Sequence, residues 1–143
     1  MRRMIYKAGL GLAALCVTSA TSFAEQSYLC AINEIYECVG ITGCKRVSPK
    51  RANLAGVMVL DVKKKQVRLA PLGGKPRTDN IESVTVTDEA ILLYGRGMRK
   101  VDRTWSAVIA LKTGNFSGGI STLLSSFAWS GTCSSKPDGS DEQ

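Results

Sequence analysis

The residues that could carry chemistry in this chain are its cysteines and carboxylates, because the sequence contains no histidine. Histidine is the usual general base of hydrolases and the commonest metal ligand. Its absence argues against Ser-His-Asp enzymes and most metal hydrolases, and the cysteines include no Cys-x-x-Cys pair of the kind that binds zinc. We therefore expect a protein that is not an enzyme and that uses neither a metal nor a cofactor.

Paired carboxylates are the remaining way to do acid–base chemistry. Two of the three candidate pairs fall in a predicted cysteine loop and a predicted hairpin turn, where acidic residues are ordinarily solvated. Two glycine-rich stretches, Gly73-Gly74-Lys75 and Gly95-Arg96-Gly97, lack the spacing of nucleotide-binding loops. The candidate pairs are Glu34 with Glu37, Asp88 with Glu89, and Asp61 with Glu82.

Residues 1–24 have the three parts of a secretory signal peptide. A basic segment, Met1–Lys7, precedes an apolar stretch that ends near residue 20 and is too short to span a bilayer. The small residues of Ser22-Phe23-Ala24 predict cleavage before Glu25. We expect a periplasmic or secreted protein with no transmembrane segment.

Four cysteines remain after that cleavage, and an even number in an exported chain predicts two disulfides. Three connectivities are possible. We favour Cys38–Cys44, because the five residues between them include two glycines and can close a small loop, which leaves Cys30–Cys133. The second bridge would tie the first strand to the last.

From residue 54 onward, short runs rich in Val, Ile and aromatic residues are separated by glycines, prolines or charged clusters, a pattern typical of strands. We predict an all-β domain over residues 25–133, with about eight short antiparallel strands forming a small meander barrel or a sandwich. A helical turn is expected at Ser48–Leu54, and residues 134–143 are expected to be a disordered acidic tail. The predicted strands are 27–32, 56–62, 66–70, 81–87, 90–95, 103–111, 116–124 and 127–133, and the interval 71–80 is expected to be a loop.

Basic residues exceed acidic ones in the folded segment 26–133, which has 15 of the former and 8 of the latter. Clusters occur near residues 45–51, 63–65 and 96–103. The last supplies a candidate binding surface for an anionic partner, although the same charges would also serve simple solubility. Few aromatic residues accompany them, so we expect no nucleic-acid binding. The candidate residues are Arg96, Arg99, Lys100 and Arg103.

Four aromatic residues allow two interpretations. In a small barrel they would form the floor of a ligand pocket, whereas in most domains of this size they fill the core. They are Tyr94, Trp105, Phe127 and Trp129.

The early Tyr28-Leu29-Cys30, the segment Trp105–Gly114 and the terminal Ser130–Cys133 resemble small secreted β-proteins of Gram-negative bacteria. The strands bridged end to end also resemble the periplasmic inhibitors of C-type lysozyme. Those inhibitors share a Ser-Gly-x-x-Tyr loop, and neither Ser117-Gly118 nor Ser130-Gly131 is followed by that tyrosine. The sequence thus favours an exported binding domain for a ligand or an anionic envelope component, with an inhibitor of an exported enzyme such as a lysozyme as the alternative.

Overall fold

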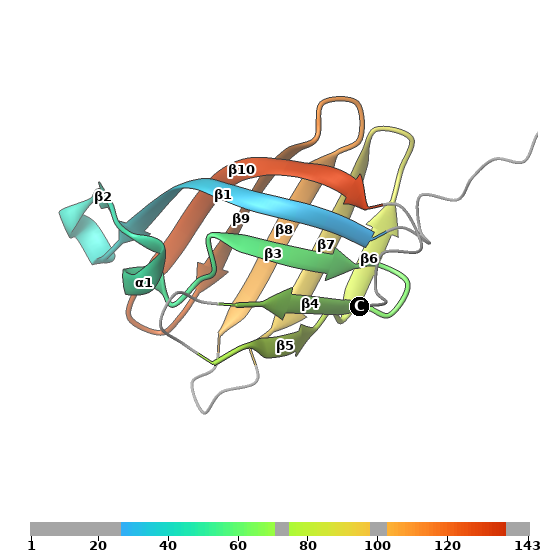
Figure 1. Cartoon of the computed structure of the whole chain (residues 1–143). Helices are drawn as coiled ribbons and strands as arrows, with labels where there is room; N and C mark the ends of the chain where they lie inside the picture. Colours follow the sequence, from blue (N-terminus) through green and yellow to red (C-terminus); the bar gives the residue numbers. More distant parts are fainter. Residues whose placement is uncertain (1–26, 71–74, 98–102, 137–143) are drawn as a thin grey trace, which may run out of the picture.

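Ten strands, all paired antiparallel, form one sheet that curls into a half-barrel (Figure 1). The computed structural model describes residues 27–70, 75–97 and 103–136. Along the sheet the strand order is β5-β4-β3-β1-β10-β9-β8-β7-β6, and β2 pairs with β1 off this path. The strands are β1 (Ser27–Cys38), β2 (Cys44–Arg46), β3 (Val57–Asp61), β4 (Gln66–Leu69), β5 (Arg77–Asn80), β6 (Ser83–Val86), β7 (Ala90–Arg96), β8 (Thr104–Ala110), β9 (Asn115–Ser121) and β10 (Ser126–Lys136).

The predicted all-β class is confirmed, and each of the eight predicted strands is present. β1 is longer than predicted, since it continues to Cys38 and pairs with β10 over its whole length. β2 and β5 are additional. The expected loop over residues 71–80 was wrong for Arg77–Asn80, because backbone pairing with β4 holds this polar segment as a strand.

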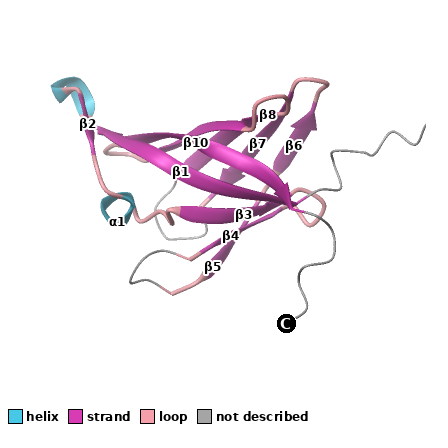
Figure 2. Ribbon diagram, turned by 45° about the horizontal axis from the view of Figure 1, so that its top comes forward, coloured by secondary structure: helices cyan, strands magenta, loops and turns pink. Residues whose placement is uncertain are grey.

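The two edges of the sheet, β5 and β6, are joined by only two residues, Ile81 and Glu82. The Ile81 N–H donates to the Lys65 carbonyl at 2.8 Å on one side, and the Glu82 N–H donates to the Tyr94 carbonyl at 2.8 Å on the other. The chain thus passes directly from one edge of the sheet to the other. Figure 2 shows the resulting curl, with β3, β4 and β5 turning away beneath β1 and β10. A single curled sheet, rather than a two-sheet sandwich, is the architecture.

Alternate residues along the strands fill the concave side of the sheet. In β8, Ala107 and Ile109 are buried and Trp105 is half-buried, as the alternation in the sequence predicts. In β3, Met58 and Leu60 face inward, whereas Val57 is 51% exposed. The largest fully buried side chains are Ile35, Leu60, Ile91, Ile109 and Phe116.

Both predicted disulfides are present. Cys30 and Cys133 are direct cross-strand partners in β1 and β10, with a Cα–Cα distance of 4.0 Å. Cys38 and Cys44 close the short loop at the other end of β1, around the 3-10 turn η2 (Gly40–Thr42), with a Cα–Cα distance of 4.1 Å. The first bridge fixes the central pair of strands, and the second fixes a peripheral hairpin.

The predicted helical turn is α1 (Pro49–Ala52). The Ser48 hydroxyl accepts a hydrogen bond from the Arg51 N–H at 3.3 Å, and Pro49 occupies the first helical position. Asn53 ends the turn in the left-handed conformation. Within the described ranges, no helix has both the length and the hydrophobicity needed to span a bilayer.

The last strand extends past the expected domain boundary at residue 133. β10 continues through Lys136, which pairs with Ser27 of β1. Residues 137–143 of the expected tail lie outside the described residues, as does the expected signal peptide.

Candidate ligand cavity

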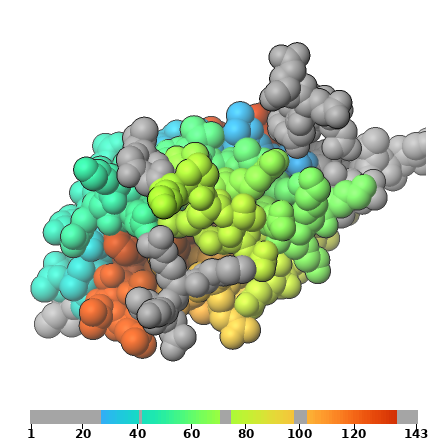
Figure 3. Space-filling model, turned by 60° about the horizontal axis from the view of Figure 1, so that its bottom comes forward, coloured from blue at the N-terminus to red at the C-terminus, as the bar shows by residue number. Residues whose placement is uncertain are grey.

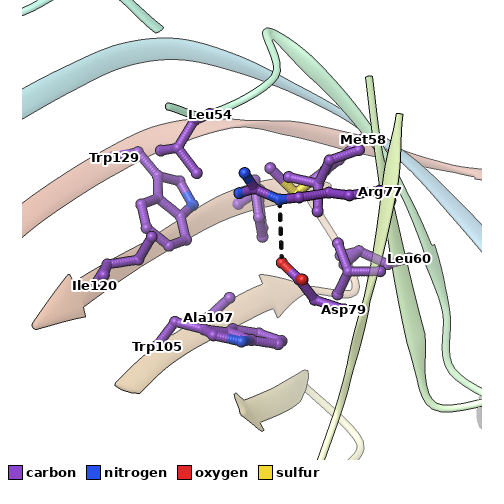
Figure 4. Close-up of a pocket in the computed structure, with 12 residues that line it drawn as sticks. Leu54, Met58, Leu60, Arg77, Asp79, Trp105, Ala107, Ile120 and Trp129 are labelled. Carbon is purple, nitrogen blue, oxygen red and sulfur yellow. Dashed lines mark ion pairs between the residues drawn. The ribbon is translucent and has the colours of Figure 1, made fainter. Parts of the chain in front are cut away.

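The concave side of the half-barrel encloses a cavity of about 40 Å³ between β3, β4 and β5 on one side and β8, β9 and β10 on the other (Figure 4). On this scale a single water-sized group needs about 10–15 Å³, so the cavity has room for more than one. Most of its wall is apolar. The apolar side chains include Met58, Leu60, Leu69, Phe116 and Ile120.

A wider space of about 270 Å³ adjoins the cavity and forms its mouth. The two spaces share four lining residues, Arg77, Asp79, Trp105 and Ile120. Arg103, the residue before β8, also lines the mouth. The inner wall is therefore apolar, and the charged side chains gather toward the opening.

An ion pair between Arg77 and Asp79 lies on the β5 wall of the cavity. Both residues are on β5 and, two positions apart, on the same face of the strand. Arg77 Nε lies 3.4 Å from Asp79 Oδ2, and the side chains are only 21% and 18% exposed (Figure 4). Arg77 Nη2 also donates to the Asn53 carbonyl at 3.1 Å. These contacts hold a charged group beside an apolar wall, where an unpaired charge would be costly.

Three buried side-chain nitrogens lack a hydrogen-bond partner within the described part of the chain, and all three belong to residues that line the cavity or its mouth. They are Arg77 Nε, Arg103 Nε and Trp129 Nε1. Trp129 is 6% exposed, and its indole nitrogen is on the edge of the ring that faces Arg77 (Figure 4). Each of these atoms is a donor. The site is therefore suited to a ligand that carries a hydrogen-bond acceptor.

Each tryptophan of the cavity pairs across the sheet with a glycine. Trp105 faces Gly95 on β7, and Trp129 faces Gly118 on β9. A Cβ at Gly95 would lie 2.5 Å from Trp105 Cε2, so only glycine leaves room for the ring. Phe116 supports Trp129 from the side, with a ring-centroid distance of 6.3 Å and an interplanar angle of 46°. Small neighbours thus let two large rings wall the cavity.

The aromatic floor expected from the sequence is present only in part. Trp105 and Trp129 line the cavity. Phe127 packs against the core, and Tyr94 is 40% exposed. Both interpretations of Trp129 hold together, because the same ring is a core residue and a cavity wall.

The two described residues of the predicted basic surface, Arg96 and Arg103, line one groove. Arg96 pairs with Glu82, with Arg96 Nε 2.8 Å from Glu82 Oε1 on the exposed side of the sheet. Arg103 also lines the cavity mouth, and its carbonyl accepts from the Gly97 N–H at 3.0 Å. Arg99 and Lys100 lie outside the described residues.

Four of the six carboxylates considered for acid–base chemistry, Glu34, Glu37, Asp61 and Glu82, form ion pairs with an arginine or a lysine. Glu37, 5% exposed, pairs with Arg51 at 3.1 Å. Asp61 accepts from the Lys64 N–H at 2.8 Å and so holds the β3–β4 turn. Within residues 27–70, 75–97 and 103–136, no cluster of cysteines and carboxylates is placed to bind a metal.

The Arg77–Asp79 pair was missed from the sequence. Arg77-Thr78-Asp79-Asn80 has no apolar residue, so its alternation gives no sign of which face is buried. The two Ser-Gly pairs of the inhibitor comparison lie inside strands, Ser117-Gly118 in β9 and Ser130-Gly131 in β10. No protein-family model matches this chain, and no curated protein resembles it significantly in sequence.

Proposed function

We propose that this protein is an exported, non-enzymatic binding domain whose half-barrel cavity takes a small anionic ligand with an apolar part. The observation that carries the proposal is the convergence on one cavity and its mouth of three buried nitrogens without a hydrogen-bond partner among the described residues, from Arg77, Arg103 and Trp129. Of these, Arg77 Nε has the ion-pair contact with Asp79, whereas Arg103 Nε and Trp129 Nε1 have no polar contact within the described part of the chain. The apolar part of the ligand would fill the inner cavity, and its acceptor group would sit near the donors.

The energetics favour an acceptor that carries charge. A buried donor without a partner costs about 1–3 kcal/mol, and hydrogen bonds to an ionised group are worth about 1.5–3 kcal/mol. The ionised side chains at the mouth are Arg77, Asp79 and Arg103, so their sum is positive. A carboxylate or a phosphate would therefore be preferred over a neutral alcohol.

The cavity dimensions limit the ligand to a small molecule. Its inner volume of about 40 Å³ takes a short apolar group, and the mouth adds about 270 Å³. Pockets that enclose drug-sized ligands are generally about 300–1,000 Å³. A short-chain carboxylic acid fits this description and supplies a defined probe.

Export is supported by the two disulfides, because such bonds persist in oxidising compartments. Periplasmic or secreted localisation remains part of this proposal, together with removal of residues 1–24. The intact mass of the protein recovered from a Gram-negative host would test it, since an N-terminus at Glu25 is expected. A retained N-terminal segment in the recovered protein would contradict this part of the proposal.

Binding of hexanoate, with hexanol as the uncharged comparison, tests the ligand site by calorimetry or by tryptophan fluorescence. Hexanoate should bind at least about tenfold more tightly than hexanol, given the strength of hydrogen bonds to charged groups. Arg103→Gln should remove most of that preference. Trp129→Phe should weaken hexanoate binding, because it deletes the indole donor and leaves an aromatic wall.

Arg46→Gln is the matched control, since Arg46 is an exposed arginine on β2 whose side chain is 64% exposed and which does not line the cavity. This control should bind hexanoate like wild type. Equal affinity for hexanoate and hexanol, or an unchanged affinity in Arg103→Gln and Trp129→Phe, would refute the proposed site.

A further inference from the structure

The β9–β10 hairpin exposes two leucines at its apex. Leu123 and Leu124 are 82% and 86% exposed, whereas every other exposed large apolar side chain of the described residues is at most 51% exposed. They lie between Ser121, the end of β9, and Ser126, the start of β10. Two adjacent and almost fully exposed leucines form a small apolar projection of the kind found where a protein meets another apolar surface.

Three N–H groups of the turn that carries these leucines, those of Thr122, Leu124 and Ser125, are paired within the turn. The Thr122 hydroxyl accepts from the Leu124 N–H at 3.3 Å and from the Ser125 N–H at 3.0 Å. The same hydroxyl donates to the Ser125 carbonyl at 2.8 Å, and the Thr122 N–H donates to that carbonyl at 2.9 Å. An apex with most of its N–H groups paired can enter an apolar medium at lower cost than one that relies on water for all of them.

Polar and basic side chains lie beside the apex. A shallow groove beside Leu123 is lined by Tyr94, Arg96 and Arg103. Tyrosine suits the boundary between water and lipid because its ring is apolar and its hydroxyl is polar. Arginine suits the same boundary, where it meets phosphate groups.

Further basic residues lie at the same end of the sheet. Ser126 pairs with Cys38, so the hairpin is beside the end of β1 that leads into β2 and α1 (Figures 1 and 2). In Figure 3 the orange atoms of this region form the lower left edge, beside the cyan and teal atoms of the β1–α1 region. The exposed basic residues of β2 and α1 are Lys45, Arg46, Lys50 and Arg51.

Among the described residues near this end, three acidic side chains are each paired with an arginine. Glu34 pairs with Arg46 at 3.5 Å, Glu37 with Arg51 at 3.1 Å, and Glu82 with Arg96 at 2.8 Å. Lys45 and Lys50 add positive charge beyond these pairs. The end of the molecule therefore joins an apolar projection to a net positive rim.

We propose that this end of the protein docks on an anionic lipid bilayer, with Leu123 and Leu124 inserted at the level of the headgroups and the basic residues against lipid phosphates. Both components are needed, because a small apolar contact or a few basic residues alone binds membranes weakly. Arg103 lines both the groove beside Leu123 and the cavity mouth. Docking would therefore bring the mouth close to the membrane, although the docking does not depend on the ligand site.

The test uses the full chain, expressed in a Gram-negative bacterium and purified as the cell processes it. Co-sedimentation is measured with vesicles of phosphatidylcholine alone and with vesicles of equal parts phosphatidylcholine and phosphatidylglycerol. Wild type should bind the anionic vesicles and should be released partly by high salt. The variant Leu123→Ser/Leu124→Ser should bind the anionic vesicles about tenfold more weakly or worse, because it removes two apolar side chains from the contact.

Leu29→Ser is the matched control. Leu29 is an exposed leucine of β1, 44% exposed, at the opposite end of the sheet, where it pairs with Ser134. Its substitution should leave vesicle binding unchanged. In a separate variant, Leu124→Trp, the added fluorophore should shift to shorter wavelength when anionic vesicles are added.

Three outcomes would overturn the proposal. They are absence of binding to anionic vesicles by folded wild type, equal binding by the Leu123→Ser/Leu124→Ser variant, and self-association through the leucines in place of vesicle binding. Sedimentation velocity without lipid would detect this self-association, which would indicate that the leucines form a dimer contact. Hexanoate binding is measured without vesicles, so failure of the ligand site and failure of membrane docking are distinguishable.

Discussion

Trp129 lies against Gly118, its direct cross-strand partner in β9. A Cβ built on Gly118 would lie 2.6 Å from Trp129 Cζ2 and 2.5 Å from the carbonyl oxygen of Ser106. The absence of a side chain at this position is what allows the indole to cover the neighbouring strand and to keep its Nε1 on the cavity side. The glycine at position 118 of β9 therefore determines where the indole N–H of Trp129 on β10 lies.

Gly118→Ala should therefore destabilise the fold and displace Trp129. Overpacking costs about 1–3 kcal/mol, and we expect the upper part of this range because the added methyl group meets a carbonyl as well as the ring. Urea unfolding followed by tryptophan fluorescence measures both effects. The control is Gly56→Ala, where a Cβ would meet no atom within 4 Å. Equal stability of the two variants would show that the sheet adjusts without cost.

Removal of Cys30–Cys133 should cost more stability than removal of Cys38–Cys44. The bridges span 103 and 6 residues, and the loop-entropy model assigns them about 4.7 and about 2 kcal/mol. Replacing both cysteines of a pair by alanine avoids a free thiol that could exchange. Denaturant melts of Cys30→Ala/Cys133→Ala and Cys38→Ala/Cys44→Ala give the comparison, and a larger loss in the second variant would contradict the model.

Thr122→Val should loosen the β9–β10 turn without affecting the rest of the sheet. The substitution removes a hydroxyl that contacts Leu124 and Ser125, and we expect a loss of about 1–2 kcal/mol. Amide exchange should accelerate at Leu124 and Ser125 above all. Thr122→Ser keeps the hydroxyl and serves as the control. Wild-type exchange rates in Thr122→Val would show that these hydrogen bonds do not hold the turn.

Stability should fall at alkaline pH because of Tyr28. Burial of this side chain, which is 5% exposed, raises its pKa above the ordinary value of 10.0. As pH rises through 10, the unfolded chain loses the proton more readily than the folded chain, so unfolding is favoured. The stabilising contribution of protonated Tyr28 is complete below pH 10 and is lost as the pH rises through the raised pKa of this side chain.

Tyr28→Phe should flatten this alkaline loss of stability, and Tyr94→Phe, at an exposed tyrosine, should not. Urea midpoints measured from pH 8 to pH 11 test the difference. The relevant quantity is the slope with pH rather than the midpoint at any one pH, since Tyr28 has other interactions whose loss would change the midpoint. Parallel profiles for Tyr28→Phe and wild type would rule out this tyrosine as the source.

Local patterns were enough to predict eight of the ten strands and the Cys38–Cys44 bridge. The alternation of Trp105, Ala107 and Ile109 marks an inward face, because a strand turns successive side chains to opposite sides whatever it packs against. Cysteine pairing followed from parity and from the glycines between Cys38 and Cys44, since a short loop brings its ends together without help from the rest of the fold. These properties depend on residues close in the chain.

The cavity was decided only by tertiary structure. Arg77, Arg103 and Trp129 are far apart in the sequence, and they converge because the sheet curls until β5 faces β8 and β10 across its interior. β5 itself is polar, so its place in the sheet comes from backbone pairing with β4 rather than from its side chains. A strand pattern states which residues share a face, but the curvature of the whole sheet decides which faces enclose a space.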